Sequence, residues 1–107
     1  MEYWIMNPND NIIIHKEYNN IKDNIMKKFP NGYQCIKKTY FDNEILLYYN
    51  PYSIEPINYN VSWLWKQIEP ETHVYGPVIL CNYNKLLNQY DTLSCLNPKD
   101  IAEIFKH

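Results

Sequence analysis

The chain has 107 residues, of which 46% are hydrophobic and 16% aromatic, and a formal net charge of −2. A chain of this length can bury a core without disulfides, and its aromatic content excludes a disordered polymer. The slightly negative charge gives no general attraction to nucleic acid or acidic membranes, and no apolar run is long enough to span a bilayer.

The composition also points to an origin and a compartment. All ten basic residues are lysine, and asparagine and tyrosine are abundant. Their codons are A/T-rich, so we expect an AT-rich genome such as that of a large DNA virus, some phages or certain protists. The first residues include Glu2 and lack a long apolar core, which predicts no signal peptide. Three widely spaced cysteines predict reduced thiols, so we expect an intracellular protein, in the host cytoplasm if viral, and not a secreted one.

The chain begins with signals for a hairpin and a helix. Two β-rich runs, Tyr3–Met6 and Asn11–Lys16, flank a polar, proline-bearing turn at Asn7–Asp10. The segment Asn20–Phe29 then carries its apolar residues on one face at helical spacing, and Pro30 follows it. We therefore predict a β-hairpin followed by an amphipathic helix.

A second hairpin is predicted from Tyr33–Tyr40 and Glu44–Asn50, which flank the turn Phe41–Asn43. Its second arm is almost continuously apolar, which is typical of an interior strand covered on both faces. The next segment, Asn50–Asn60, carries two prolines and is expected to be an ordered loop across the surface.

The remaining elements are shorter. We predict a helix over Asn60–Ile68, capped by Asn60 or Ser62, and a strand over Thr72–Asn82 in which Gly76-Pro77 requires a bulge, an edge position or a bend.

The last quarter of the chain holds one ambiguous segment and one clear helix. The segment Asn84–Cys95 has no clear pattern, although a helical turn at Lys85–Gln89 is compatible with it. The final helix starts at the cap Asn97 and turns its apolar residues inward. The sum is one α+β domain over residues 1–107, with an antiparallel or mixed sheet of about five strands built from hairpins and two or three short helices on one face.

These elements resemble a small domain family of unknown function found in phage, plasmid and large DNA virus genomes. The matching pieces are Tyr3–Pro8, Asn50, Gly76–Leu80 and the stretch from Leu96 to Ile104. The chain departs from the family pattern at Cys81-Asn82, where a glycine is expected after the aliphatic strand. The resemblance implies a viral or mobile-element accessory protein, and it supplies no catalytic residues.

Aromatic residues give the leading functional prediction. Tyrosine and tryptophan dominate protein interfaces, and we expect the tyrosines of Glu44–Asn50 to build the core while those of Asn50–Asn60 face outward. Trp63 and Trp65 are two residues apart, so on a helix they diverge by about 200° and one of them is expected to look outward. The sequence thus predicts a module that binds another protein or itself. Its candidate contacts are Tyr52, Tyr59, Trp63 and Trp65.

Single-stranded nucleic acid is the alternative partner. In proteins that bind single strands, lysines bind the phosphates and bases stack on exposed aromatic rings. Two lysine pairs lie near tyrosines in this sequence. The candidate residues are Lys27, Lys28, Lys37, Lys38, Tyr33 and Tyr40. The acidic total and the absence of arginine, which binds phosphate bidentately, weigh against this alternative.

A small cysteine/histidine enzyme is the second alternative. It would draw on Cys35, Cys81 and Cys95 with His15 and His73, but neither CxxC nor HxxxH spacing occurs. The carboxylates Glu55, Glu69 and Glu71 sit near prolines, and a solvated loop is expected there. The sequence therefore predicts a non-enzymatic protein with no catalytic residues, no metal and no cofactor.

Overall fold

The protein is described by a computed structural model that covers residues 2–10, 14–17, 21–93 and 96–106. In chain order its elements are β1 (Glu2–Met6), β2 (Ile14–Glu17), α1 (Ile21–Lys28), β3 (Gln34–Tyr40), β4 (Asn43–Tyr49), the 3₁₀ helix η1 (Tyr59–Val61), α2 (Ser62–Ile68), β5 (Val78–Asn84), β6 (Gln89–Asp91) and α3 (Pro98–Lys106). Within these ranges, no helix has the length and apolar character that crossing a membrane requires.

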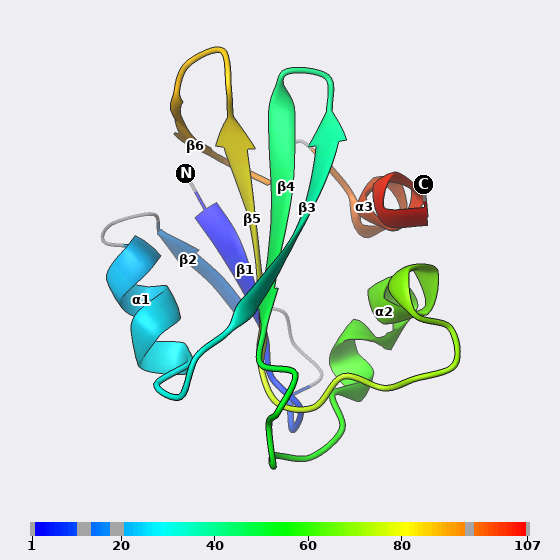
Figure 1. Cartoon of the computed structure of the whole chain (residues 1–107). Coiled ribbons are helices and arrows are strands. Elements are labelled where there is room, and N and C mark those ends of the chain that lie inside the picture. Colours follow the sequence, from blue (N-terminus) through cyan, green and yellow to red (C-terminus); the bar gives the residue numbers. More distant parts are fainter. Residues whose placement is uncertain (1, 11–13, 18–20, 94–95, 107) are drawn as a thin grey trace.

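The sheet is open, and all of its described pairings are antiparallel (Figure 1). Five strands lie side by side in the order β2-β1-β5-β4-β3. The sixth strand, β6, pairs with the end of β5, beyond the stretch that pairs with β1. The predicted α+β class and the antiparallel arrangement are confirmed. The strand β5 lies in the middle and joins the two predicted hairpins, β1–β2 and β3–β4, into one sheet.

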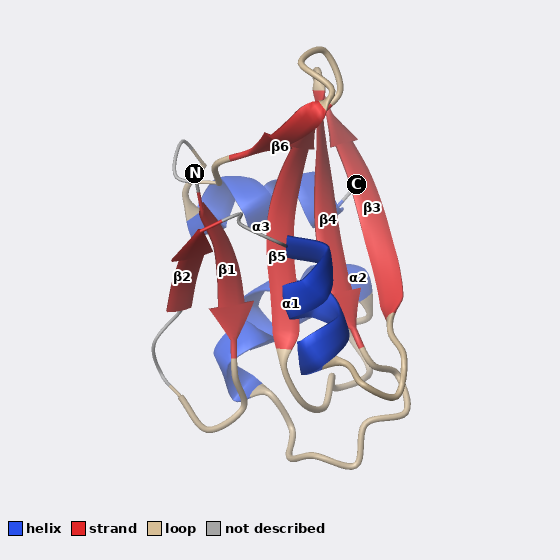
Figure 2. Ribbon diagram, turned by 90° about the vertical axis from the view of Figure 1, so that its left-hand side faces the viewer, coloured by secondary structure: helices blue, strands red, loops and turns tan. Residues whose placement is uncertain are grey.

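Helices cover both faces of this sheet, so the prediction that they share one face is wrong. Figure 2 shows α1 in front of the sheet and α2 and α3 behind it. The α1-side core contains Tyr3, Ile5, Ile21, Ile25, Phe29, Leu46, Ile79 and Cys81. The α2/α3-side core contains Trp4, Met6, Ile45, Leu47, Val61, Leu64, Trp65, Val74, Val78, Leu80, Leu93, Ile101 and Phe105. The strands β1, β4 and β5 are apolar on both faces, and two-sided strands require cover on both sides.

Four predicted elements appear close to their expected places. The helix α1 and the β3–β4 hairpin match, and Tyr40 pairs with Asn43 across a tight turn. The helix α3 begins with a reciprocal cap, in which the Asp100 amide donates to Asn97 Oδ1 at 2.8 Å and the Asn97 amide donates to the Asp100 carboxylate at 3.4 Å. The β1–β2 hairpin also forms, although residues 11–13 of its expected second arm lie outside the described ranges.

Two other predictions need correction. The helix α2 continues directly from η1, so its N-cap position is Val61 instead of Asn60 or Ser62. The strand expected over Thr72–Asn82 begins at Val78, because Gly76 turns the chain with a φ of 77° and Pro77 follows. The strand is central and not an edge, and of the three alternatives for Gly76-Pro77 the structure has the bend. In the ambiguous segment Asn84–Cys95, residues 85–88 form a turn that leads into β6, a short strand that depends on pairing with β5.

Candidate functional site

The loop from Asn50 to Asn60 is irregular but ordered. Two local turns shape it: the Tyr52 amide donates to Asn50 Oδ1 at 2.9 Å, and the Glu55 amide donates to Ser53 Oγ at 3.1 Å. Side chains of this type often replace backbone hydrogen bonds where prolines prevent regular structure. The loop therefore has a defined conformation before it meets any partner.

Asn58 anchors this loop to the rest of the fold. Its buried side-chain Nδ2 donates to the carbonyl of Met6 at 2.9 Å and to that of Gly76 at 2.8 Å, while its backbone amide donates to the Val74 carbonyl at 2.9 Å. The Gly76 amide in turn donates to the Pro56 carbonyl at 2.9 Å. One asparagine thus ties three chain segments together at the end of the sheet where β1 stops and β5 begins.

Four large side chains project from these tied segments into solvent. They are Tyr52, Ile54, Tyr59 and Tyr75, and we call them the loop surface. Tyr52 is 85% exposed and Ile54 fully exposed. The segment that carries Ile57 also pairs with Tyr75 through an isolated β-bridge, which keeps the two halves of the surface adjacent. Large exposed side chains on an ordered scaffold are a feature of docking sites.

A pocket of about 240 Å³ opens beside the loop surface. Its walls include Tyr59, Ser62, Trp65, Lys66, Thr72 and His73, and we call it the Trp65 pocket. The indole Nε1 of Trp65 donates to Thr72 Oγ1 at 3.2 Å, and the Thr72 hydroxyl lies 3.0 Å from the Glu69 carboxylate. A second pocket of about 170 Å³ shares Trp65 and Thr72–Val74 with the first and also has Glu69 and Tyr75 in its wall.

The structure separates the predicted protein-binding residues. Tyr52 and Tyr59 are exposed, as expected for their loop. Trp63 is half-buried against the α2/α3-side core, and its Nε1 donates to the Asn60 carbonyl at 3.0 Å. Trp65 is only 5% exposed, because it packs into the same core with Tyr49 against its ring. Sequence reasoning missed Ile54 and Lys66, since nothing in a lone isoleucine or lysine marks it as part of a surface.

The core tyrosines behave as the sequence predicts. Tyr48 and Tyr49 of β4 are half-buried, and they lie on opposite faces of the sheet. Tyr49 keeps its hydroxyl near the surface, where it donates to Gln34 Oε1 at 3.0 Å. The division between packed tyrosines in β4 and exposed tyrosines in the following loop is confirmed.

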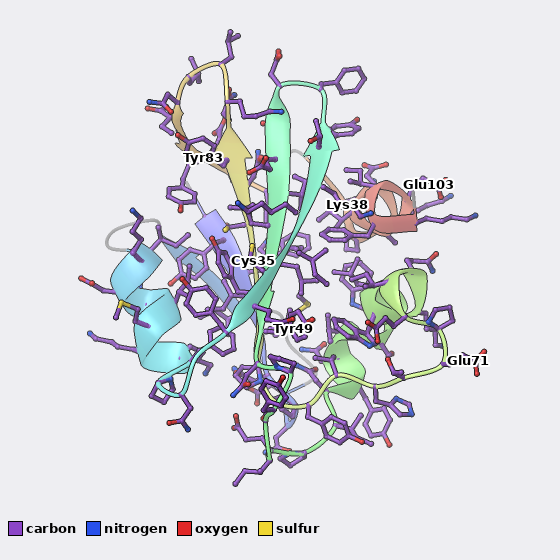
Figure 3. The ribbon with its side chains drawn as sticks, viewed as in Figure 1. Cys35, Lys38, Tyr49, Glu71, Tyr83 and Glu103 are labelled. Carbon is purple, nitrogen blue, oxygen red and sulfur yellow. The ribbon has the colours of Figure 1, made fainter. Side chains whose placement is uncertain are left out.

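The predicted nucleic-acid contacts do not form one patch. Lys37 and Lys38 are neighbours on β3 and point to opposite faces of the sheet, and Lys38 lies on the α3 side (Figure 3). Lys27 and Lys28 end α1, which covers the face to which Lys37 points. Tyr33 packs its ring against Phe29 and Tyr48, while Tyr40 packs against Phe41. The two tyrosines therefore lie on separate parts of the molecule.

The two described cysteines lie on the opposite side of the sheet from the described histidine. Cys35 and Cys81 belong to the α1 side of the sheet, whereas the exposed His73 lies in the loop after α2, beyond the opposite face. Burial raises the pKa of both thiols, so neither forms a thiolate readily. Cys95 and the side chain of His15 lie outside the described part of the chain. Among the residues that the structure does describe, no group of three His, Cys, Asp or Glu side chains could hold a metal ion.

Raising the pH above about 9 is expected to destabilise the fold. Burial, more than any neighbour, raises the pKa of Cys81 and of Tyr48 above their ordinary values of 9.0 and 10.0. The folded state therefore keeps both groups neutral, and their stabilising contribution is complete below the unfolded pKa and lost as the pH rises past it. Urea midpoints should be flat from about pH 7 to about pH 8 and fall between about pH 9 and about pH 11. A flat midpoint through the alkaline range would contradict this.

A second apolar patch lies at the opposite end of the sheet. It consists of Phe41, Leu86 and Leu87, at the adjacent tips of the β3–β4 and β5–β6 hairpins, and we call it the hairpin tips (Figure 1). The Lys85 amide donates to the Asp42 carbonyl at 2.7 Å and joins the two tips. Phe41 has a φ of 54°, which a bulky residue adopts at a cost. Because these side chains are as exposed as those of the loop surface, the hairpin tips offer a matched apolar control for it.

Of the predicted carboxylates, Glu69 is engaged with Thr72, and Glu71 points away from the protein beyond α2 (Figure 3). Comparison of the chain with family models, with curated proteins and with solved structures finds no match.

Proposed function

We propose that this protein is a non-enzymatic module that binds another protein through the loop surface, in the accessory role that the family resemblance implies. The observation that supports the proposal most is the exposure of Tyr52, Ile54, Tyr59 and Tyr75 on one anchored loop system. Tyrosine supplies large contact area at low conformational cost, and it is enriched among residues that dominate binding energy.

Pre-organisation is the second support. A flexible apolar loop would lose conformational entropy on binding, about 0.5–1.5 kcal/mol for each side chain and more for backbone. Here the backbone already has its hydrogen bonds, through Asn50, Ser53 and Asn58. The entropy lost when the loop binds a partner is therefore smaller than for a flexible loop, and it offsets less of the energy gained by burying the four side chains.

The test uses the purified chain and a display library of random peptides, so the natural partner need not be identified first. Two variants are compared with the wild type. The loop variant carries Tyr52→Ser, Ile54→Ser and Tyr59→Ser, and the control carries Phe41→Ser, Leu86→Ser and Leu87→Ser at the hairpin tips. Both remove exposed apolar side chains, so non-specific stickiness falls in both.

Peptides selected on the wild type are expected to bind the control variant and to lose binding to the loop variant by at least tenfold. Circular dichroism should show that both variants remain folded, because the replaced side chains are exposed. Selection of no peptide, or of peptides that depend on the hairpin tips, would overturn the proposal. Salt-sensitive binding of an oligonucleotide, unchanged in the loop variant, would favour nucleic acid instead.

A further inference from the structure

The Trp65 pocket has the dimensions and lining of a site for one apolar side chain. Its volume is about 240 Å³, and Trp65, Pro70 and Val74 supply apolar wall. For comparison, an apolar cavity of about 150 Å³ in another protein accommodates benzene. Trp65 is held by its hydrogen bond to Thr72 and by the Tyr49 ring at 5.1 Å, so the wall is rigid.

The formal charge at this pocket is positive. Lys66 lines it, and no aspartate or glutamate does so among the described residues. Lys66 is exposed on α2 and makes no ion pair within the part of the chain that the structure describes. Glu69 lines the second pocket instead, and its carboxylate accepts a hydrogen bond from the Thr72 hydroxyl at 3.0 Å.

Hydrogen-bond donors complete the rim. Ser62 and His73 line the same pocket as Lys66, so a hydroxyl and an imidazole are available there beside the lysine. His73 is positioned by the Tyr59 ring, whose centroid lies 6.3 Å away in an edge-on arrangement. A pocket lined by Trp65, Pro70 and Val74 together with a lysine and a serine matches a ligand that joins an apolar group to a carboxylate.

We propose that the Trp65 pocket is the specificity site of the docking surface and takes an apolar side chain next to a carboxylate in an extended segment of a partner protein. This inference rests on the proposed function. Tyr59 lines the pocket and also belongs to the loop surface, and Tyr75 links that surface to the second pocket. A segment anchored in the pocket can therefore continue over the exposed rings, which an isolated small acid cannot do.

The first arm of the test uses small probes. Chemical shifts in a ¹H–¹⁵N spectrum are followed while 3-phenylpropionate, neutral 3-phenylpropanol or cationic 3-phenylpropylamine is added. The acid should shift the amides of Ser62–Val74 and bind at least tenfold more tightly than the other two. Lys66→Met should remove this preference, and Lys99→Met, a matched loss of an exposed lysine on α3, should retain it.

The second arm uses capped peptides in which phenylalanine is followed by aspartate or by asparagine. The aspartate peptide should bind at least tenfold more tightly than the asparagine peptide and more tightly than 3-phenylpropionate. Binding of the small acid without binding of the peptide would overturn the assignment to a partner segment, and equal binding of acid, alcohol and amine would overturn the pocket's preference. If display-selected peptides depend on the loop surface yet ignore Lys66→Met, this inference fails while the proposed function stands.

Discussion

Replacing Asn58 with alanine is expected to lower the free energy of unfolding by about 2–4 kcal/mol, a large part of the stability of a small domain. The substitution removes both side-chain donors from the carbonyls of Met6 and Gly76 in a buried setting. Each buried carbonyl left without its donor costs about 1–3 kcal/mol. Urea denaturation followed by circular dichroism measures the loss.

Two further variants show whether hydrogen bonding causes this loss. Asn58→Asp keeps the volume of the side chain but places acceptors against two carbonyls, so it should destabilise at least as much as alanine. Asn31→Ala changes an exposed asparagine and should alter the free energy of unfolding by less than about 0.5 kcal/mol. If Asn58→Ala and Asn31→Ala cost the same, Asn58 does not anchor the loop.

Replacing Gly76 with alanine is expected to cost about 2–3 kcal/mol, from two separable sources. The residue has a φ of 77°, which disfavours any L side chain. An added Cβ would also lie 2.6 Å from Ser53 Oγ and 3.3 Å from Ser53 Cβ. The loop would have to move away from β5, so binding through the loop surface should weaken as well.

Gly32→Ala is the matched control for this prediction. Gly32 also has a positive φ, 105°, but nothing lies within 4 Å of the Cβ that alanine would add. Its cost should reflect backbone conformation alone, about 1 kcal/mol. Adding Ser53→Gly to Gly76→Ala should recover part of the lost stability. Equal costs for the two glycines, or no recovery in the double variant, would show that the contact with Ser53 is unimportant.

The local elements of the fold were predictable because their signals are short-range. The cap at Asn97 and Asp100 marks the start of α3, and apolar spacing over Ile21–Lys28 marks α1. The hairpin of β3 and β4 follows from two strand-like runs around a tight turn. In each case the residues that form the element also specify it, so distant contacts are not needed to identify it.

Features that depend on pairing between distant segments were not predictable in this way. The strand β6 has three residues and no apolar alternation, and it exists because β5 offers hydrogen-bonding groups beyond the end of β1. Because β5 is central and apolar on both faces, both faces of the sheet need a covering helix. The apolar run of β4 indicated that both faces of this strand are buried. Which helix covers which face depends on the path of the connections between elements, and residue patterns do not specify that path.

The candidate site shows the same division. The sequence by itself determined that the tyrosines of β4 pack while those of the next loop are exposed, because a continuous apolar strand and a proline-rich loop bury their side chains differently. Only the tertiary structure decided that Trp65 is buried and that Trp65 and Lys66 line a pocket. The sequence shows that Trp63 and Trp65 point in different directions from a helix, but not which of the two directions faces the core. It also selected Asn58 from fifteen asparagines as the anchor. The physical reason is that burial and hydrogen bonding there depend on Met6 and Gly76, which are 52 and 18 residues away along the chain.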